Sequence, residues 1–154
     1  MVLRREGIVD GPTYDEIIAA KLLTEVVLEA LHSAQYIYPL LAPPITLPAE
    51  GNAWTWGALT TIAAINVIGA DYSVHELSIS GMSANANFAI RLSYGAGDTF
   101  WAYASIARGG VQAQSVVIPV SGGIIPANSI FTAQLADSIG TSTLALKIAY
   151  HLHP

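Results

Sequence analysis

Strict two-residue alternation is the feature that most narrows the fold of this chain. Within residues 142–153 every second side chain from Leu144 to Leu152 is large and apolar, and the side chains between them are Ala, Lys or His. Residues 86–94 show the same pattern, and a Gly-rich turn after them returns the chain through residues 99–107. Because successive side chains of a strand point to opposite faces, the pattern predicts strands with one buried face.

Weaker strand patterns occupy residues 54–67, 72–80, 114–120 and 129–136. Together with the three clear patterns they make about seven short strands with turn signals between them. This organisation predicts a mainly β fold. We expect a β-sandwich of jelly-roll type with about seven strands, preceded by one long N-terminal α-helix and a Pro-rich arm.

The predicted helix runs from Tyr14 to about Ala34, and Thr13 and Glu16 fit a capping box at its start. Its few polar residues fall mainly on one line, and nearly all others are apolar. An ordinary surface helix is apolar over only about a third of its circumference. We therefore expect this helix to pack against copies of itself or another protein; burial within its own fold is the alternative. The residues assigned to this interface are Ile17, Leu22, Val26 and Leu31.

Residues 38–52 form a Pro-rich stretch, "YPLLAPPITLPAEGN". Its four prolines exclude a continuous helix and favour extended chain, so it is predicted to be an arm, or alternatively a packed surface loop. We accordingly divide the chain into residues 1–50, the helix and arm for oligomerisation or attachment, and residues 51–154, the sandwich domain. The sandwich has its own alternating apolar faces and can form a core without the helix.

The predicted sandwich carries almost no charge. Residues 51–154 hold three basic and four acidic residues, a net charge of −1, and residues 109–136 hold none. The absence of a basic face argues against a nucleic-acid partner. Uncharged strand edges invite aggregation unless they are covered. We therefore expect much of this surface to be buried in a homo-oligomer, which we predict to be a trimer.

Neither a membrane span nor a disulfide is expected. Residues 51–70 are uncharged and long enough to span a bilayer, but Asn and Thr interrupt them and no Lys or Arg flanks them. The N-terminal residues lack the apolar region of a signal peptide. The chain has no cysteine, which excludes disulfides and thiolate metal sites.

No sequence motif of a nucleophile elbow, phosphate-binding loop, zinc protease or EF-hand is present. His151 and His153 form an H-x-H pair, but the sequence places no third metal ligand beside them. His75 and Glu76 are neighbours on a predicted strand, so we expect them on opposite faces and not as a catalytic pair. We predict a protein that is not an enzyme and needs no metal or cofactor.

Three aspartates, Asp71, Asp98 and Asp137, fall in or near predicted turns. Aspartate in a turn commonly accepts hydrogen bonds from its own backbone. We interpret these carboxylates as structural.

The aromatic residues form two pairs by spacing. Trp54 and Trp56 are predicted to share one strand face, and Trp101 and Tyr103 another. Such pairs serve most often as core or interface anchors, and stacking on sugars is the alternative. We assign all four residues to the predicted interface.

The C-terminal stretch "GGIIPANSIFTAQLADSIGTSTLALKIAYH" resembles a module of structural proteins of tailed bacteriophages. There an apolar strand leads to an I-P-A-x-S/T turn, here Ile125 to Ser129, and a final strand ends near a Tyr-His pair, here Tyr150 and His151. The similarity covers about the last 40 residues. Members often carry Arg where this chain has Phe131.

The resemblance implies a β-sandwich virion component, assembled in the host cytoplasm. Its partners would be copies of itself and the major capsid protein or another virion protein. It carries over no catalytic residue. We predict a non-enzymatic phage structural protein, specifically a capsid decoration (cement) protein that stabilises the capsid surface. A carbohydrate- or receptor-binding tail or fibre module is the alternative.

Overall fold

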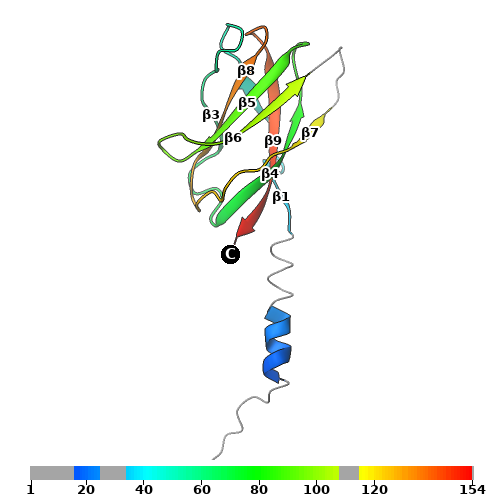
Figure 1. The fold of residues 1–154 in the computed structure, drawn as a ribbon, viewed down its shortest axis with the longest axis vertical. Coiled ribbons are helices and arrows are strands. Elements are labelled where there is room, and N and C mark those ends of the chain that lie inside the picture. The colour runs from blue at the N-terminus through cyan, green and yellow to red at the C-terminus, as the bar shows by residue number, and fades with distance from the viewer. Residues whose placement is uncertain (1–15, 25–33, 108–114, 154) are drawn as a thin grey trace, which may run out of the picture. The chain divides into compact units, whose positions relative to one another are not determined.

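A computed structural model describes residues 16–24, 34–107 and 115–153 (Figure 1). The chain divides into two compact units, Met1–Ser33 and Ala34–Pro154. In the first unit the described residues form one short helix, residues 16–24, and all of its side chains are exposed. The remaining residues of the predicted long helix, 14, 15 and 25–33, lie outside the described part of the chain.

The second unit is a sandwich of two antiparallel sheets, which confirms the predicted fold (Figure 1). One sheet has the order β2-β9-β4-β7, with β1 on the same edge of β9 as β2; the other has the order β3-β8-β5-β6. These two interleaved orders are those of a jelly roll. The strands are β1 (Tyr36–Tyr38), β2 (Ile45–Pro48), β3 (Thr60–Ala63), β4 (Asp71–Ser80), β5 (Asn87–Tyr94), β6 (Thr99–Ala107), β7 (Val116–Pro119), β8 (Phe131–Asp137) and β9 (Thr143–His153).

The core lies between the two sheets and uses the predicted alternation. In β9 the side chains of Leu144, Leu146 and Ile148 are buried, and in β5 those of Phe88 and Ile90 are buried. The residues between them face outward and are small or polar. Burial of apolar surface contributes about 25 cal/mol for each Å² removed from water, and it is the main force that holds the two sheets together.

The Pro-rich arm is part of the sandwich. β1 and β2 pair along one edge of β9, with Tyr36 opposite Tyr150 and Leu47 opposite Leu144, and Leu47 is completely buried. The structural boundary therefore lies between residues 33 and 34, and not at residue 50 as the composition suggested. Two strands of three and four residues are too short to show alternation, and an edge strand tolerates proline because one side of it needs no hydrogen-bond donors.

The long weak strand predicted over residues 54–67 is much shorter in the structure. Within this range only Thr60–Ala63, which is β3, forms a strand, and it pairs with β8; residues 54–59 form a turn and an irregular segment before it. Trp54 has a positive φ of 61° in that turn, which interrupts the extended chain. Trp54 and Trp56 therefore do not lie on a strand.

Candidate functional site

The outer face of the β3-β8-β5-β6 sheet carries an exposed aromatic platform, made of Trp56, Phe100 and Tyr103. The Tyr103 side chain is 61% exposed and that of Phe100 is 49% exposed. The Tyr103 ring centroid lies 5.8 Å from that of Trp56, with 20° between the ring planes, and 4.6 Å from that of Phe100, with 41° between the planes. The three rings therefore form one continuous surface.

A bulge in β6 decides which aromatic residues belong to the platform. The register passes from Leu92 opposite Ala102 to Ser93 opposite Phe100, so Trp101 has no partner on β5. The extra residue reverses the alternation. Trp101 points inward, is 8% exposed and donates a hydrogen bond from Nε1 to the Gly123 carbonyl at 2.7 Å. The prediction that Trp101 and Tyr103 share a face is therefore wrong, and Phe100 joins Tyr103 instead.

A row of polar side chains runs across the sheet to the platform. Strand pairing places Gln134 of β8, Arg91 of β5 and Tyr103 of β6 side by side. The Arg91 Nη1 donates to Gln134 Oε1 at 3.4 Å, and Gln134 Nε2 donates to the Gly57 carbonyl at 2.9 Å. Gly57 follows Trp56, so this row fixes the segment that carries the indole. The Arg91 Nε is buried and has no hydrogen-bond partner among the described residues.

The other predicted interface residues are dispersed. Ile17 and Leu22 are more than half exposed on the N-terminal helix, and Trp54 is 55% exposed in its turn. Val26 and Leu31 lie outside the described residues. Phe100 was missed because its sequence position alone predicts a face shared with Ala102 and not with Tyr103.

The outer face of the other sheet carries a histidine cluster, His75, His151 and His153. The ring centroids of His75 and His151 are 4.1 Å apart. The Ser73 Oγ lies 3.0 Å from His75 Nε2 and 2.9 Å from His153 Nε2. One hydroxyl thus joins two imidazoles. In the parts of the chain that the structure describes, no group of three His, Cys, Asp or Glu side chains is arranged to hold a metal ion.

A bulge in β4 creates this cluster. The register passes from Val74 opposite Tyr150 to Glu76 opposite Ala149, which leaves His75 without a partner on β9. His75 therefore contacts His151, and Glu76 faces outward as well. The prediction that His75 and Glu76 point to opposite faces is wrong, because it assumed an unbroken alternation.

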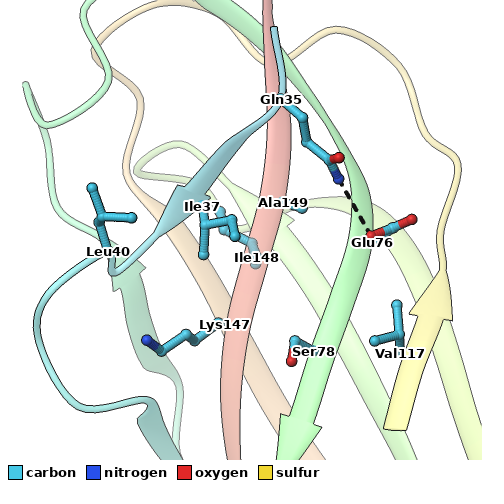
Figure 2. Close-up of a pocket in the computed structure, with 9 residues that line it drawn as sticks. All are labelled: Gln35, Ile37, Leu40, Glu76, Ser78, Val117, Lys147, Ile148 and Ala149. Carbon is cyan, nitrogen blue, oxygen red and sulfur yellow. Dashed lines mark hydrogen bonds between the residues drawn. The ribbon is translucent and has the colours of Figure 1, made fainter.

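A shallow groove lies on the same sheet face, across β1, β9, β4 and β7 (Figure 2). Its volume is about 380 Å³. The Gln35 Nε2 donates to Glu76 Oε2 at 3.3 Å at one end of the groove. Most of the lining is apolar, and its charged members are Glu76 and Lys147. Ile37, Leu40 and Val117 contribute exposed aliphatic side chains.

The histidine cluster makes stability depend on pH. Burial lowers the pKa of His75 below its ordinary value of 6.5, and the neighbouring His151 and His153 lower it further, whereas Glu76 partly opposes them. The unfolded chain then takes up the proton at a higher pH than the folded chain. The contribution of neutral His75 to the stability of the fold is fully present above about pH 6.5. It is lost as the pH decreases through that value and down to the pKa of His75 in the folded chain.

We therefore expect the melting temperature to fall by a few degrees between pH 7.5 and pH 5.5. In the His75→Gln variant the fall should be smaller, because Gln can bond to Ser73 but does not titrate. The His32→Gln variant, which alters the one histidine outside the cluster, is the control. Thermal unfolding followed by circular dichroism measures both. If the melting temperature falls equally with pH in the wild type and in His75→Gln, the cluster does not control the loss of stability in acid.

The fold and its surfaces define a jelly-roll sandwich, with an aromatic platform on one outer sheet face and a histidine cluster beside a mostly apolar groove on the other. In the described residues no helix has the length and apolar character needed to cross a membrane. No protein-family model matches the chain, and no curated protein matches it in sequence.

Several solved structures are similar to it. One is a chain of infectious bursal virus derived T=1 particles, which matches 79% of this chain at 16% identity and a TM-score of 0.40. A chain of the T13 infectious bursal disease virus particle gives 14% identity and a TM-score of 0.38. The chain spans about a third of the length of these viral chains, 32% and 31% respectively. A carbohydrate-binding module of Cellvibrio mixtus lichenase 5A, in complex with cellotriose, matches over its whole length and 73% of this chain, at 13% identity and a TM-score of 0.35.

Proposed function

We propose that the protein is a non-enzymatic structural component of a tailed-bacteriophage virion, and specifically a decoration protein that binds and stabilises the capsid surface. The observation that carries the proposal is the apolar N-terminal helix. Ile17, Ile18, Leu22 and Leu23 are all exposed on it. Large apolar surfaces on soluble proteins mark contacts with other proteins. The resemblance of the last 40 or so residues to phage structural proteins supplies the biological setting.

The scarcity of charge supports the same proposal. The whole chain has 11% charged residues, against about 25% in ordinary domains. On the sandwich, Leu40, Leu41 and Ile124 add exposed aliphatic side chains to those of the helix. In the proposed assembly the helix joins copies of the chain into a trimer, and the major capsid protein or another virion protein covers part of the sandwich.

The helix is the part to test first. We expect the full chain to be a trimer at micromolar concentration, and the Ile17→Asp/Leu22→Asp variant to be a monomer, because charge in an apolar contact loses its solvation. The Ile17→Leu/Leu22→Met variant keeps the apolar surface and should remain a trimer. Light scattering coupled to size-exclusion chromatography measures the mass. A monomeric wild type, or a charged variant that stays trimeric, would refute the proposed role of the helix.

A further inference from the structure

We propose that β6 pairs edge to edge with β6 of a second copy of the chain, antiparallel about a two-fold axis at Ser105. β6 is an outermost strand of the β3-β8-β5-β6 sheet, and its partner in that sheet is β5. Among the described residues no strand and no loop backbone bonds to the other side of β6. The backbone N–H and C=O groups of alternate residues on that side can therefore bond to a further strand.

The other edges of the sandwich carry features that hinder the addition of a strand. β3 and β7 have four residues each, and β7 ends in Pro119. β1 and β2 have three and four residues; Pro39 follows β1 and Pro48 ends β2. Short edge strands, prolines and charged side chains are the usual protection against edge-to-edge pairing. β6, Thr99–Ala107, has nine residues, no proline and no charged side chain.

The bulge in β6 limits the pairing to residues 103–107. β6 is irregular around Trp101, whereas from Tyr103 to Ala107 it pairs with β5 one residue to one. Because a bulge hinders the addition of a strand, the regular segment is the part that can accept one. An antiparallel pair that uses all five residues has its two-fold axis at the middle one, Ser105. A register shifted by one residue would place inward side chains opposite outward ones.

This segment is complementary to itself in that register. On the outer face Tyr103 lies opposite Ala107 of the second copy, and Ser105 lies opposite its own counterpart. On the inner face Ala104 lies opposite Ile106. Each large side chain thus has a small one as its neighbour, and no pair brings like charges together. A two-fold contact uses the same surface on both copies, so a second copy is the partner that this strand fits.

The contact is small, and we expect it to be weak. Five paired residues from each copy bury less surface than a standard interface of about 1,600 Å². We therefore expect a dissociation constant of roughly 0.1–1 mM. Such a contact becomes effective between oligomers that are already held close together. It does not involve the N-terminal helix, so it is tested in the full chain with Ile17→Asp and Leu22→Asp, in which the proposed helix contact is removed.

The first test is cross-linking. The chain has no cysteine, so one introduced thiol reports on one position. In Ser105→Cys the two thiols face each other across the axis, where opposite Cα atoms are about 4.5–5.5 Å apart, a separation that a disulfide spans. Under mild oxidation, near the expected dissociation constant, non-reducing electrophoresis should show the covalent dimer forming at least tenfold faster than in the two control variants.

The controls for the cross-linking are Ala107→Cys and Thr61→Cys. Ala107 is exposed on the same strand, but its two copies lie about 13 Å apart along the proposed pair. Thr61 is exposed on β3, at the opposite edge of the same sheet. These variants separate the proposed register from accidental oxidation of any exposed thiol.

The second test blocks the edge with charge. Ser105→Lys brings two ammonium groups opposite each other at the axis, so it should weaken dimerisation at least tenfold in sedimentation equilibrium. Thr61→Lys adds the same charge at the opposite edge of the sheet and should leave dimerisation unchanged. Both residues are exposed, so both variants should melt like the parent chain.

Three results would overturn the inference. One is disulfide formation in Ser105→Cys no faster than in the controls, and another is a dissociation constant that Ser105→Lys leaves unchanged. The third is preferential cross-linking of Ala107→Cys, because the register would then be wrong. If the trimer test fails and the wild-type chain is a monomer, the same substitutions are made in the wild-type chain. The pairing of β6 and the role of the helix are thus decided separately.

Discussion

A chain that lacks residues 1–33 should fold and melt cooperatively, whereas a chain that lacks residues 1–50 should not. The longer deletion removes β1 and β2, and with them Leu47, which is completely buried. Removing most of one buried leucine side chain alone costs about 3–5 kcal/mol, and a domain is stable by only about 5–15 kcal/mol. The deletion also leaves one edge of β9 without partners from Thr143 to Tyr150.

The two truncated chains and a point variant together locate the boundary. Circular dichroism should give a β-rich spectrum and a cooperative melt for the chain that starts at Ala34. The Leu47→Ala variant of the full chain should lose about 3 kcal/mol in urea unfolding. A chain starting at Gly51 that melts like the one starting at Ala34 would show that the arm is dispensable. The chain that starts at Ala34 should also fail to form trimers, because it lacks the helix that we propose as the contact between copies.

Replacing Asp137 with Asn should cost about 2–4 kcal/mol. This carboxylate is fully buried at the end of β8. Its Oδ1 accepts from the backbone N–H groups of Ile139, at 3.0 Å, and of Gly140, and its Oδ2 accepts from that of Ser142 at 2.8 Å. Asn presents an NH₂ group where one of these donors needs an acceptor, so a buried N–H loses its partner.

The same loop leads to the aromatic platform. The Asp137 carbonyl accepts from the Trp54 N–H at 2.7 Å, two residues before Trp56. Gly140, with a φ of +83°, packs so closely that a Cβ would collide with the backbone of Asn52.

The control for the Asp137→Asn variant is Asp98→Asn. Asp98 is exposed in a turn with a φ of 49°, which Asn tolerates, so its stability should change by less than about 0.5 kcal/mol.

The Asp137 carboxylate also predicts acid sensitivity. Burial acts to raise its pKa, but hydrogen bonds from Ser142 and from the Gly140 and Ile139 N–H groups outweigh burial and hold the pKa below 3.8. The unfolded chain is therefore protonated first, and stability falls as the pH decreases below about 4. Urea unfolding at pH 7, 4 and 3 should show this loss in the wild type and a smaller one in Asp137→Asn. An Asp137→Asn variant as stable as the wild type at pH 7 would contradict the structural role of the carboxylate.

Several features followed from the sequence because they are local. Alternation over residues 86–94 and 142–153 identified two strands and their buried faces, since side-chain direction in an unbroken strand depends only on position. Asp137 was interpreted as a turn residue that binds backbone, and the structure confirms that interpretation. Residues 17–23 are apolar except for Lys21, and this predicted a helix that must pack against another surface. The role of the helix in self-association stays a prediction.

Other features depended on strands far apart in the chain. The arm forms strands only because β9 offers it an edge. The platform exists because the bulge in β6 turns Phe100 to the face of Tyr103, and because Gln134 of β8 holds the segment that carries Trp56 beside them. The two bulges, at His75 and Trp101, reversed the predicted faces of the residues beside them. A bulge is one residue too many relative to a partner strand. It is therefore a property of a pair of strands. The sequence of one strand predicts which side chains lie on each of its faces, and only the register with the neighbouring strand decides where that alternation breaks.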